Sequence, residues 1–261
     1  MLPFLVQKMQ NHMRRRLWSS PLSIVPFPLR PEAKRDRTIA AEITAYEKSA
    51  GFAHSAGSLP LRTLLRVEQL LTGTSLASAE TGCGKSTILL SRISSSHKVF
   101  CLDDRNEGSN SSVAYFMNCA ATRMETLEIV FGPTQLTLPA YTDHIPYDLV
   151  FIDGPHGFPF PELEYYFFYP HLKTGGLLVI DDIHIPTVGR LADFISEDRM
   201  FAKVEFIGAT AVFRRTDAPV FDPFGDGWWL QDFNRRRADF ARDIHLCDGR
   251  RHAPINFEGK F

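Results

Sequence analysis

Two groups of residues in this chain have types and spacings that could support chemistry. The first is AETGCGKST (79–87), in which an acid is followed by two glycines and a stretch that favours a helix. The second is a set of acids that follow two apolar runs, in FIDGPHG (151–157) and VIDDIH (179–184). The glycine run could bind an anion or a polar cofactor, and the acids could bind a cation. The elements that carry these residues must decide between such interpretations.

The glycine run allows two interpretations. Read from Ala79, it fits a loosened phosphate-binding loop, in which Lys85 would reach nucleotide phosphates and Ser86 would bind magnesium. Read from Glu80, it is Glu-x-Gly-x-Gly, an acid and a glycine turn that open a helix and suit an adenosyl cofactor. Glycines let the backbone approach a ligand, and the N–H groups of the helix start can face a phosphate or a carboxylate alike. The glycines alone therefore do not decide.

The surrounding pattern predicts the fold class. From residue 75 onward, apolar strand candidates alternate with helix candidates, which predicts a mostly parallel sheet covered on both faces. Two further strand candidates, 202–208 and 209–215, have almost nothing between them, so only an antiparallel hairpin can join them. We therefore expect an α/β fold with a Rossmann-like, doubly wound sheet of seven strands. The predicted parallel strands are 75–80, 98–103, 127–132, 147–154 and 176–182, and the helices between and after them are 85–93, 109–123, 161–173 and 188–198.

Three features favour the adenosyl interpretation over the nucleotide interpretation. The carboxylate of Glu80 would lie where the phosphates of a nucleotide bind, and would repel them. Asp103 and Asp104 end the next predicted strand, about 20 residues after the glycines, where an acid suits a pair of ribose hydroxyls. The terminal antiparallel hairpin is also foreign to the usual sheet of nucleotide hydrolases.

The run from Leu76 to Arg215 resembles the class I S-adenosylmethionine-dependent methyltransferases. ETGCGKST resembles the first motif of that family, VFCLDD its second strand and ribose acid, LKTGGLLVIDD its Gly-Gly turn before strand five, and VEFIGATAVFRR its reversed strand-seven hairpin. Lys85 and Ser86 depart from the family pattern, and we expect the amine of Lys85 to lie in solvent. The resemblance implies cofactor contacts from Glu80, Gly82 and Gly84 to the methionine part of S-adenosylmethionine, from Asp103 to its ribose, and from Thr134 and Gln135 in GPTQ to its adenine.

Simpler roles for some of these residues stay open. Glu80 could be a solvated turn residue, and Asp103 or Asp104 could cap a helix. The aromatic run YYFFY (165–169) could be mistaken for a stacking platform, but its place between two strands predicts core packing.

The acids at the ends of the fourth and fifth predicted strands form the second candidate site. Asp153, Asp181 and Asp182 should converge at one edge of the sheet, where carboxylates repel one another unless a cation lies among them. Oxygen ligands suit Mg²⁺ or a similar ion. The arrangement resembles the metal-dependent O-methyltransferases, including the catechol, caffeoyl-type and sugar-modifying enzymes. That resemblance implies Asp153 as a metal ligand beside the cofactor, Asp181 and Asp182 as further ligands, and His156 of DGPH as the base.

The chemistry expected from this resemblance is methyl transfer to a hydroxyl of a small molecule or sugar. Ordinary roles stay open for these residues too, since Asp-Gly is a common turn dipeptide and Asp182 could cap a helical turn. Many family members also use no metal. Two rival functions remain, a phosphate-loop nucleotide hydrolase or kinase and a non-catalytic module with the methyltransferase fold.

Composition sets broader limits. The 261 residues carry a net charge of −1, so no global basic field points to nucleic acid, and no apolar run approaches the ~20 residues of a membrane span. The four cysteines are scattered, which favours a reducing compartment and a cytoplasmic location. The Arg-rich start allows a transit peptide, a basic surface helix or a loose arm. Neither the acceptor nor the oligomeric state can be read from the sequence.

The predicted organisation has three parts. Residues 1–58 form an N-terminal arm with helices, 59–216 the methyltransferase domain, and 217–261 a tail that could cover the substrate cleft. Trp228, Trp229 and Phe233 in this tail could line an acceptor pocket, although we favour packing onto the domain.

Overall fold

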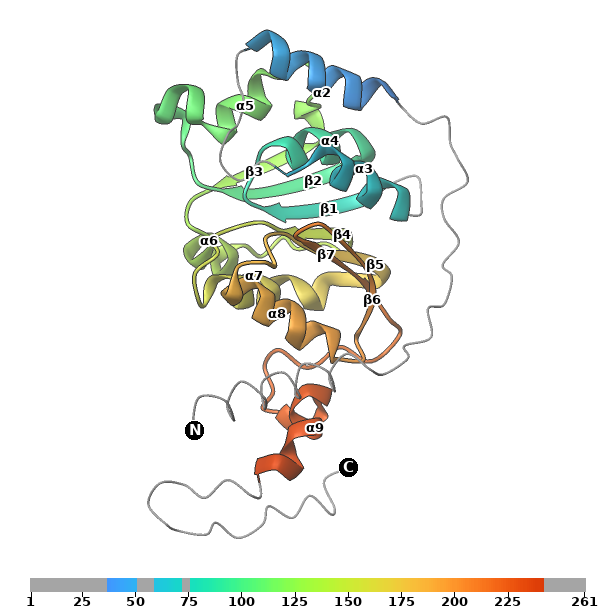
Figure 1. The fold of residues 1–261 in the computed structure, drawn as a ribbon. Helices are drawn as coiled ribbons and strands as arrows, with labels where there is room; N and C mark the ends of the chain where they lie inside the picture. The colour runs from blue at the N-terminus through green and yellow to red at the C-terminus, as the bar shows by residue number, and fades with distance from the viewer. Residues whose placement is uncertain (1–36, 51–58, 72–75, 242–261) are drawn as a thin grey trace, which may run out of the picture.

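The computed structural model describes residues 37–50, 59–71 and 76–241, and its centre is one seven-stranded sheet (Figure 1). The strand order is β3-β2-β1-β4-β5-β7-β6. The pairs among β1 to β5 are parallel, β7 runs antiparallel to β5, and β6 runs antiparallel to β7. The predicted doubly wound sheet and its terminal hairpin are therefore confirmed. The strands are β1 Leu76–Thr81, β2 Ser94–Cys101, β3 Leu127–Phe131, β4 Tyr147–Ile152, β5 Leu172–Ile180, β6 Phe201–Ile207 and β7 Thr210–Arg215.

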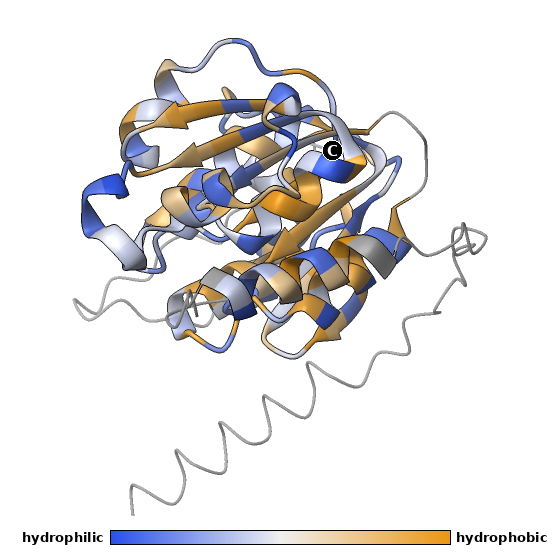
Figure 2. Cartoon of the chain, turned by 90° about the horizontal axis from the view of Figure 1, so that it is seen from above, coloured by the Kyte–Doolittle hydropathy of each residue, from blue (hydrophilic) through white to orange (hydrophobic). Residues whose placement is uncertain are grey.

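Helices cover both faces of this sheet and enclose two apolar clusters. One face carries α3, α4 and α5, with α2 lying over them, and the other carries α6, α7 and α8 (Figure 1). Figure 2 shows that the strands are mostly hydrophobic, as strands buried on both faces must be. The helices are α2 Arg37–Ala50, α3 Leu61–Leu70, α4 Lys85–Ile93, α5 Ser112–Asn118, α6 Thr134–Ala140, α7 Phe160–Phe168, α8 Pro186–Ser196 and α9 Asp232–Ala241.

The strand order places the two candidate sites side by side. The chain moves outward from β1 to β3 and then crosses back to β4, so the winding direction changes between β1 and β4. Ligands of such sheets bind at this switch point, beyond the carboxyl ends of the strands. Thr81 at the end of β1 pairs with Ile152 at the end of β4. The glycine run and the acids after β4 therefore leave the sheet as neighbours.

Several element ends differ from the predictions for a local reason. The helix predicted over 109–123 is shortened to α5, Ser112–Asn118, and a 3₁₀ turn precedes it. The carboxylate of Asp104 accepts hydrogen bonds from the backbone N–H of Ser112 (2.7 Å) and of Val113 (3.0 Å), which fixes the start of the helix. Asp104 therefore has the capping role that was left open for it. β5 ends at Ile180, so Asp181 and Asp182 lie just beyond the strand.

The segment after β7 packs back onto the domain. The ring of Phe233 lies 5.0 Å from that of Phe194 in α8, and Arg199 forms a two-pronged ion pair with Asp232 at the start of α9. These contacts support packing for Phe233, while Trp228 and Trp229 contact each other edge to face. The predicted basic segment before residue 37 and the residues after 241 lie outside the described part of the chain.

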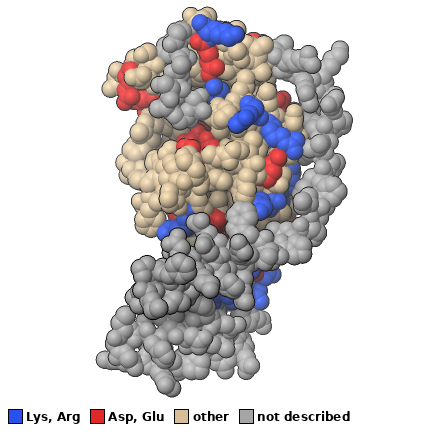
Figure 3. Space-filling view, in the orientation of Figure 1, with Lys and Arg blue, Asp and Glu red and all other residues tan. Residues whose placement is uncertain are grey.

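The described surface mixes both charge signs. On the face shown in Figure 3, acidic and basic side chains lie in small separate groups. None of the helices within residues 37–50, 59–71 and 76–241 is long and apolar enough to span a bilayer. Within the aromatic run 165–169, Tyr165, Phe168 and Tyr169 are buried, which confirms the prediction of core packing.

Candidate active site

The glycine turn after β1 is fixed by close packing on one side and open on the other. Gly82 has a φ of +77°, and a Cβ at this position would lie 2.2 Å from the carbonyl oxygen of Asp153. Only glycine fits there, because a side chain would collide with the backbone that leaves β4. Gly84 has a φ of +149°, and a Cβ there would meet no described atom within 4 Å. The turn thus presents its open side at Gly84, where a ligand can approach the backbone.

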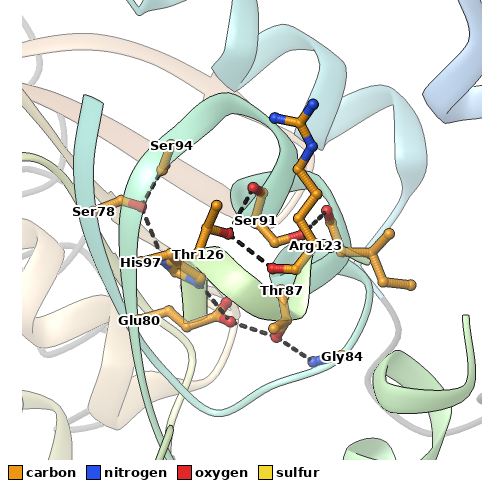
Figure 4. A network of polar contacts seen from close by, with 10 residues as sticks. Ser78, Glu80, Gly84, Thr87, Ser91, Ser94, His97, Arg123 and Thr126 are labelled. Atoms are coloured by element: carbon orange, nitrogen blue, oxygen red, sulfur yellow. Dashed lines mark hydrogen bonds and ion pairs between the residues drawn. The ribbon is translucent and has the colours of Figure 1, made fainter. Parts of the chain in front are cut away.

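Glu80 lies beneath this turn as part of a buried polar network (Figure 4). Its side chain is fully buried, so it is not a solvated turn residue. Its Oε1 atom accepts a hydrogen bond from the hydroxyl of Thr87 and lies 3.1 Å from Nε2 of His97. Thr87 Oγ1 in turn accepts a hydrogen bond from the backbone N–H of Gly84 (2.9 Å). Through Thr87, the carboxylate of Glu80 therefore holds the backbone of the glycine turn in place.

The second oxygen of Glu80 tests which ligand the turn fits. Glu80 Oε2 is buried and has no hydrogen-bond partner among the described residues. A buried carboxylate oxygen without a donor favours a cationic or N–H-bearing neighbour and opposes a phosphate. S-adenosylmethionine carries an ammonium group and a sulfonium, so its methionine part fits this position, and a nucleotide triphosphate does not.

Lys85 does not lie in solvent as expected. Its Nζ atom is 2.7 Å from Oε1 of Glu47 in α2, and its side chain is largely buried. The same Glu47 oxygen accepts a hydrogen bond from the hydroxyl of Tyr115 (3.0 Å). The physical reason for the error is that α2 covers the start of α4 and supplies a carboxylate there. The lysine thus links an N-terminal helix to the glycine turn.

The two acids after β2 have different surroundings. Asp103 is exposed, and both of its oxygens accept hydrogen bonds from the guanidinium of Arg105 (2.7 and 2.6 Å), which lowers the pKa of Asp103. Asp104 turns inward and caps α5. Asp103 is thus the exposed acid of this pair, paired with Arg105, and its contact with a ribose stays a prediction.

The residues predicted beside the adenine open helix α6. Thr134 is its first residue and is buried, and its Oγ1 atom has no hydrogen-bond partner among the described residues. Gln135 is exposed beside it. A buried hydroxyl without a partner is costly unless a ligand or water satisfies it. The Thr134 hydroxyl also acts on the carboxyl of Glu164, whose pKa it lowers, so its contact with the adenine remains a prediction.

A compact cluster of possible metal ligands follows β4 and β5. One ligand atom each from Asp153, His156 and Asp182 lies within 4.8 Å of the others. His156 Nε2 is 3.1 Å from Asp182 Oδ2 and 3.9 Å from Asp153 Oδ1, without hydrogen-bond geometry in either contact. Asp182 has a φ of +56°, a left-handed conformation that is uncommon outside glycine. A backbone held in this state, with partner atoms left without hydrogen bonds, is typical of a ligand site.

Asp181, predicted as a third metal ligand, is not part of this cluster. Its side chain is buried, and its Oδ1 accepts a hydrogen bond from the hydroxyl of Thr210 in β7 (2.6 Å). The reason is the alternation of side chains where β5 ends, which turns Asp181 and Asp182 in different directions. His156 takes the third position in the group.

Burial and repulsion between carboxylates make the cluster of Asp153, His156 and Asp182 unfavourable without a ligand. Burial raises the pKa of Asp153 to about 7, with added repulsion from Asp181 and Asp182, although the neighbouring His156 acts in the opposite direction. The carboxylate of Asp153 raises the pKa of His156, with Asp182 and Asp181 acting the same way. A divalent cation among these groups would relieve the repulsion, so their chemistry fits one.

Glu164 is a buried acid that the sequence reasoning missed. It lies in α7, and its Oε2 accepts a hydrogen bond from Thr81 Oγ1 (2.7 Å), which itself accepts one from the backbone N–H of Asp153 (3.2 Å). A Cβ at Gly154 would lie 2.1 Å from Glu164 Oε1, so the acid fills the space beneath this turn. Burial raises the pKa of Glu164 to about 7. The available signal was its spacing from Pro161 and Phe168, both on the buried helix face.

Comparison with known proteins adds a family match. Residues 79–183 match a family model described as a methyltransferase domain. This segment of the chain therefore carries a methyltransferase domain. The matched residues run from the glycine turn to the acids after β5 and thus include both candidate sites. No curated protein matches the sequence.

Solved structures share the fold of this methyltransferase at low sequence identity. One assigned as a caffeoyl-CoA O-methyltransferase from Staphylococcus aureus is 13% identical, with a TM-score of 0.51, and the match covers 81% of this chain and 99% of that chain. One assigned as an O-methyltransferase from Klebsiella pneumoniae is 12% identical, with a TM-score of 0.52 and coverages of 80% and 96%. The O-methyltransferase NovP is 14% identical, with a TM-score of 0.53 and coverages of 70% and 99%. At these identities the likeness concerns the fold.

Proposed function

We propose that this methyltransferase transfers a methyl group to a hydroxyl of a small molecule or sugar, with help from a divalent cation. The observation that carries the proposal is the cluster of Asp153, His156 and Asp182 beside the glycine turn. It combines carboxylate oxygens with an imidazole at the edge where the methyl donor should bind. The three O-methyltransferase structures with the same fold are consistent with this chemistry.

The reaction is a direct displacement. The acceptor hydroxyl loses its proton to Nε2 of His156 while its oxygen forms a bond to the methyl carbon, and the bond between that carbon and the sulfonium sulfur breaks. The sulfur leaves as the neutral thioether of S-adenosylhomocysteine. Because the leaving group needs no protonation, the protein mainly has to align the two reactants. Once Nε2 of His156 has taken the proton, Asp182 Oδ2, 3.1 Å away, would stabilise the imidazolium.

Asp153 and Asp182 would hold the cation, for which we propose Mg²⁺. Such an ion would lower the pKa of a bound acceptor hydroxyl and neutralise the two carboxylates. Asp181 would support the site indirectly, because its hydrogen bond with Thr210 ties the end of β5 to β7. We keep His156 as the base, and metal titration of His156→Gln tests this choice. A base variant keeps metal affinity, whereas loss of a ligand lowers it.

The cofactor would lie across β1, β2 and β3. We propose that Glu80, Gly82 and Gly84 face its methionine part, that Asp103 exchanges one hydrogen bond from Arg105 for the ribose hydroxyls, and that Thr134 and Gln135 flank the adenine. Asp153, packed against Gly82, would then lie between the cofactor and the cation.

Two rival functions make different predictions. A phosphate-loop enzyme requires a lysine facing the turn, whereas Lys85 pairs with Glu47 and Glu80 lies beneath the turn. A non-catalytic module would bind S-adenosylmethionine without transferring its methyl group. The buried acids speak for catalysis, because an unused cluster of this kind would only cost stability.

The test is release of S-adenosylhomocysteine in the presence of an acceptor panel of catechols, other phenols and sugars, with and without a chelator. We expect turnover with at least one hydroxyl acceptor, loss of turnover with chelator, and recovery on adding Mg²⁺. Turnover that ignores the chelator would reject the metal, and turnover only with amine or thiol acceptors would reject O-methylation.

A further inference from the structure

We propose that His97 is a positioning residue for the cofactor site. It holds the carboxylate of Glu80 as an ionised acceptor beneath the glycine turn, and thereby favours the charged sulfonium of S-adenosylmethionine over the neutral thioether of S-adenosylhomocysteine. The inference rests on the proposed place of Glu80 beside the methionine part of the cofactor.

The hydrogen bonds around His97 form one chain from β2 to the glycine turn (Figure 4). His97 Nδ1 is 2.8 Å from the hydroxyl of Ser78, which is 2.7 Å from the hydroxyl of Ser94. His97 Nε2 is 3.1 Å from Glu80 Oε1. Beyond Glu80, the chain continues through Thr87 to the backbone N–H of Gly84. Every link in this chain is buried.

The donors in this chain can be assigned from its ends. Gly84 N–H must donate to Thr87 Oγ1, so the hydroxyl hydrogen of Thr87 is directed to Glu80 Oε1. A carboxylate oxygen that already accepts from Thr87 can only accept from His97, so the proton of the imidazole lies on Nε2. Nδ1 of a neutral imidazole then accepts from Ser78, and Ser78 accepts from Ser94. An imidazolium that donates from Nδ1 to Ser78, with Ser78 donating to Ser94, satisfies the same contacts, and in both arrangements Nε2 donates to the carboxylate of Glu80.

Burial explains why this partner matters. His97 and Glu80 are both 0% exposed, and a buried carboxylate remains charged only when donors face it. Two side-chain donors, His97 and Thr87, point at the same oxygen, and Thr87 is itself committed to the turn. Removing the imidazole would take away the donor supplied by β2 and leave this oxygen with Thr87 as its one side-chain donor among the described residues. The negative charge beneath the glycine turn would then be less well stabilised.

The functional consequence concerns the charge of the ligand. S-adenosylmethionine and S-adenosylhomocysteine share their adenosine, ammonium and carboxylate groups, and differ in the methyl group and the sulfonium charge. With Glu80 beside the methionine part of the cofactor, as proposed, its buried negative charge would favour the charged ligand, by an effect that we expect to be about tenfold. A turn that was merely loosened would weaken both ligands alike. The ratio of the two affinities therefore separates positioning of a charge from structural support.

The experiment measures the dissociation constants of both ligands by calorimetry for the wild type, His97→Phe, His97→Gln, Glu80→Gln and Ser91→Ala. Ser91 is the matched control, since it is equally buried, in α4. Its hydroxyl accepts a hydrogen bond from the backbone N–H of Arg123, which is not part of the hydrogen-bond chain around His97. We expect the preference for S-adenosylmethionine to fall about tenfold in His97→Phe and in Glu80→Gln. It should fall less in His97→Gln, whose amide can still donate, and stay unchanged in Ser91→Ala.

A double variant makes the test decisive. In the Glu80→Gln background, a further His97→Gln change should not alter the preference, because His97 acts through Glu80. Equal weakening of both ligands in the His97 variants, or an unchanged preference, would overturn the inference. If His97→Phe fails to fold, His97→Ala, which also lacks a donor, takes its place with the same readings. Failure of the wild type to bind either ligand would instead contradict the proposed cofactor site.

Discussion

The two acidic regions at the switch point of the sheet differ in how their charges are satisfied. Beneath the glycine turn, Glu80 accepts from Thr87 and lies beside the ring nitrogen of His97, all buried. At the mouth after β4 and β5, Asp153 and Asp182 face each other and His156 without hydrogen-bond geometry to His156. The first region is largely complete within the chain, whereas the second needs a ligand. From this comparison we propose that the first region holds the cofactor and the second performs the chemistry.

The regions are nevertheless mechanically joined. Gly82 packs on the carbonyl of Asp153, and Thr81 bonds to the backbone of Asp153 and to Glu164. Successive side chains of a strand point to opposite faces of the sheet. At the end of β1, Glu80 and Thr81 therefore contact residues on opposite sides of the sheet. We therefore propose that the end of β1 sets the distance between the methyl donor and the cluster of Asp153, His156 and Asp182.

Asp182→Asn should produce the largest effect. Asparagine tolerates the left-handed backbone at this position, so the fold should be retained. The change removes a negatively charged carboxylate that would bind the cation. We expect methyl transfer to fall by about 10²- to 10³-fold, as for loss of a group that acts on the reacting atoms. Initial rates of S-adenosylhomocysteine release measure this. Asp143→Asn, in an exposed loop, is the control, and full chelator-sensitive activity in Asp182→Asn would contradict the assignment.

Gly82→Ala should break the joint between the two regions. The added Cβ would lie 2.2 Å from backbone, at a positive φ, so both collision and strain oppose it. We expect a loss of about 2–4 kcal/mol in the free energy of unfolding. Gly108→Ala shares the positive φ but meets no described atom, so it should cost about 1 kcal/mol. Urea unfolding of both variants decides, and equal costs would show that packing on Asp153 is unimportant.

Glu164→Gln should change the pH dependence of stability. The folded pKa of Glu164, about 7, lies above its value of 4.5 in the unfolded chain, so the folded state retains a proton longer. The resulting stability is present below pH 4.5 and is lost as the pH rises through about 7, by up to about 3 kcal/mol. Glutamine should remove this loss.

The measurement is the difference between urea midpoints of the wild type and Glu164→Gln from pH 4.5 to 8, with chelator present. The difference should change across this window in favour of the variant as the pH rises. Glu162→Gln, at a half-buried acid of the same helix that pairs with Arg190, should follow the wild type. Parallel curves for the wild type and Glu164→Gln would mean that Glu164 does not titrate there.

Lys85→Met should have the smallest effect. The ion pair with Glu47 is partly exposed, so its loss should cost less than about 1 kcal/mol, and the affinity for S-adenosylmethionine should change less than about threefold. Calorimetry and thermal unfolding measure both. A phosphate-loop protein would lose its ligand on this change, so a loss of binding above about 30-fold would revive that interpretation.

The sequence predicted the sheet because its signals are local. Apolar strands, the glycine turn and the short link between β6 and β7 determine the topology through chain stiffness and loop length, and helix 85–93 was predicted with the bounds of α4. The acids after β4 and β5 were also placed correctly at one edge. These features depend on residues that are close in sequence.

The errors and omissions concern partners that only tertiary packing supplies. The amine of Lys85 pairs with Glu47 because α2 packs over α4. No pattern in AETGCGKST indicates this pairing. Glu164 lies on the buried face of the predicted helix 161–173, where an isolated polar residue could have been noticed. His97 lies just before the predicted strand 98–103, because β2 begins earlier, at Ser94. Asp181 lies outside the group of Asp153, His156 and Asp182, and its carboxylate instead accepts a hydrogen bond from Thr210 of β7.

The central claim is that the two regions have separate tasks, and paired titrations of Glu80→Gln and Asp182→Asn test it most directly. Calorimetry with S-adenosylmethionine and with Mg²⁺ gives four affinities. The account predicts that Glu80→Gln weakens S-adenosylmethionine at least tenfold and leaves Mg²⁺ within about threefold of the wild type, and that Asp182→Asn does the reverse. If either variant weakened both ligands to the same extent, or neither, the division between a cofactor region and a reaction region would be contradicted.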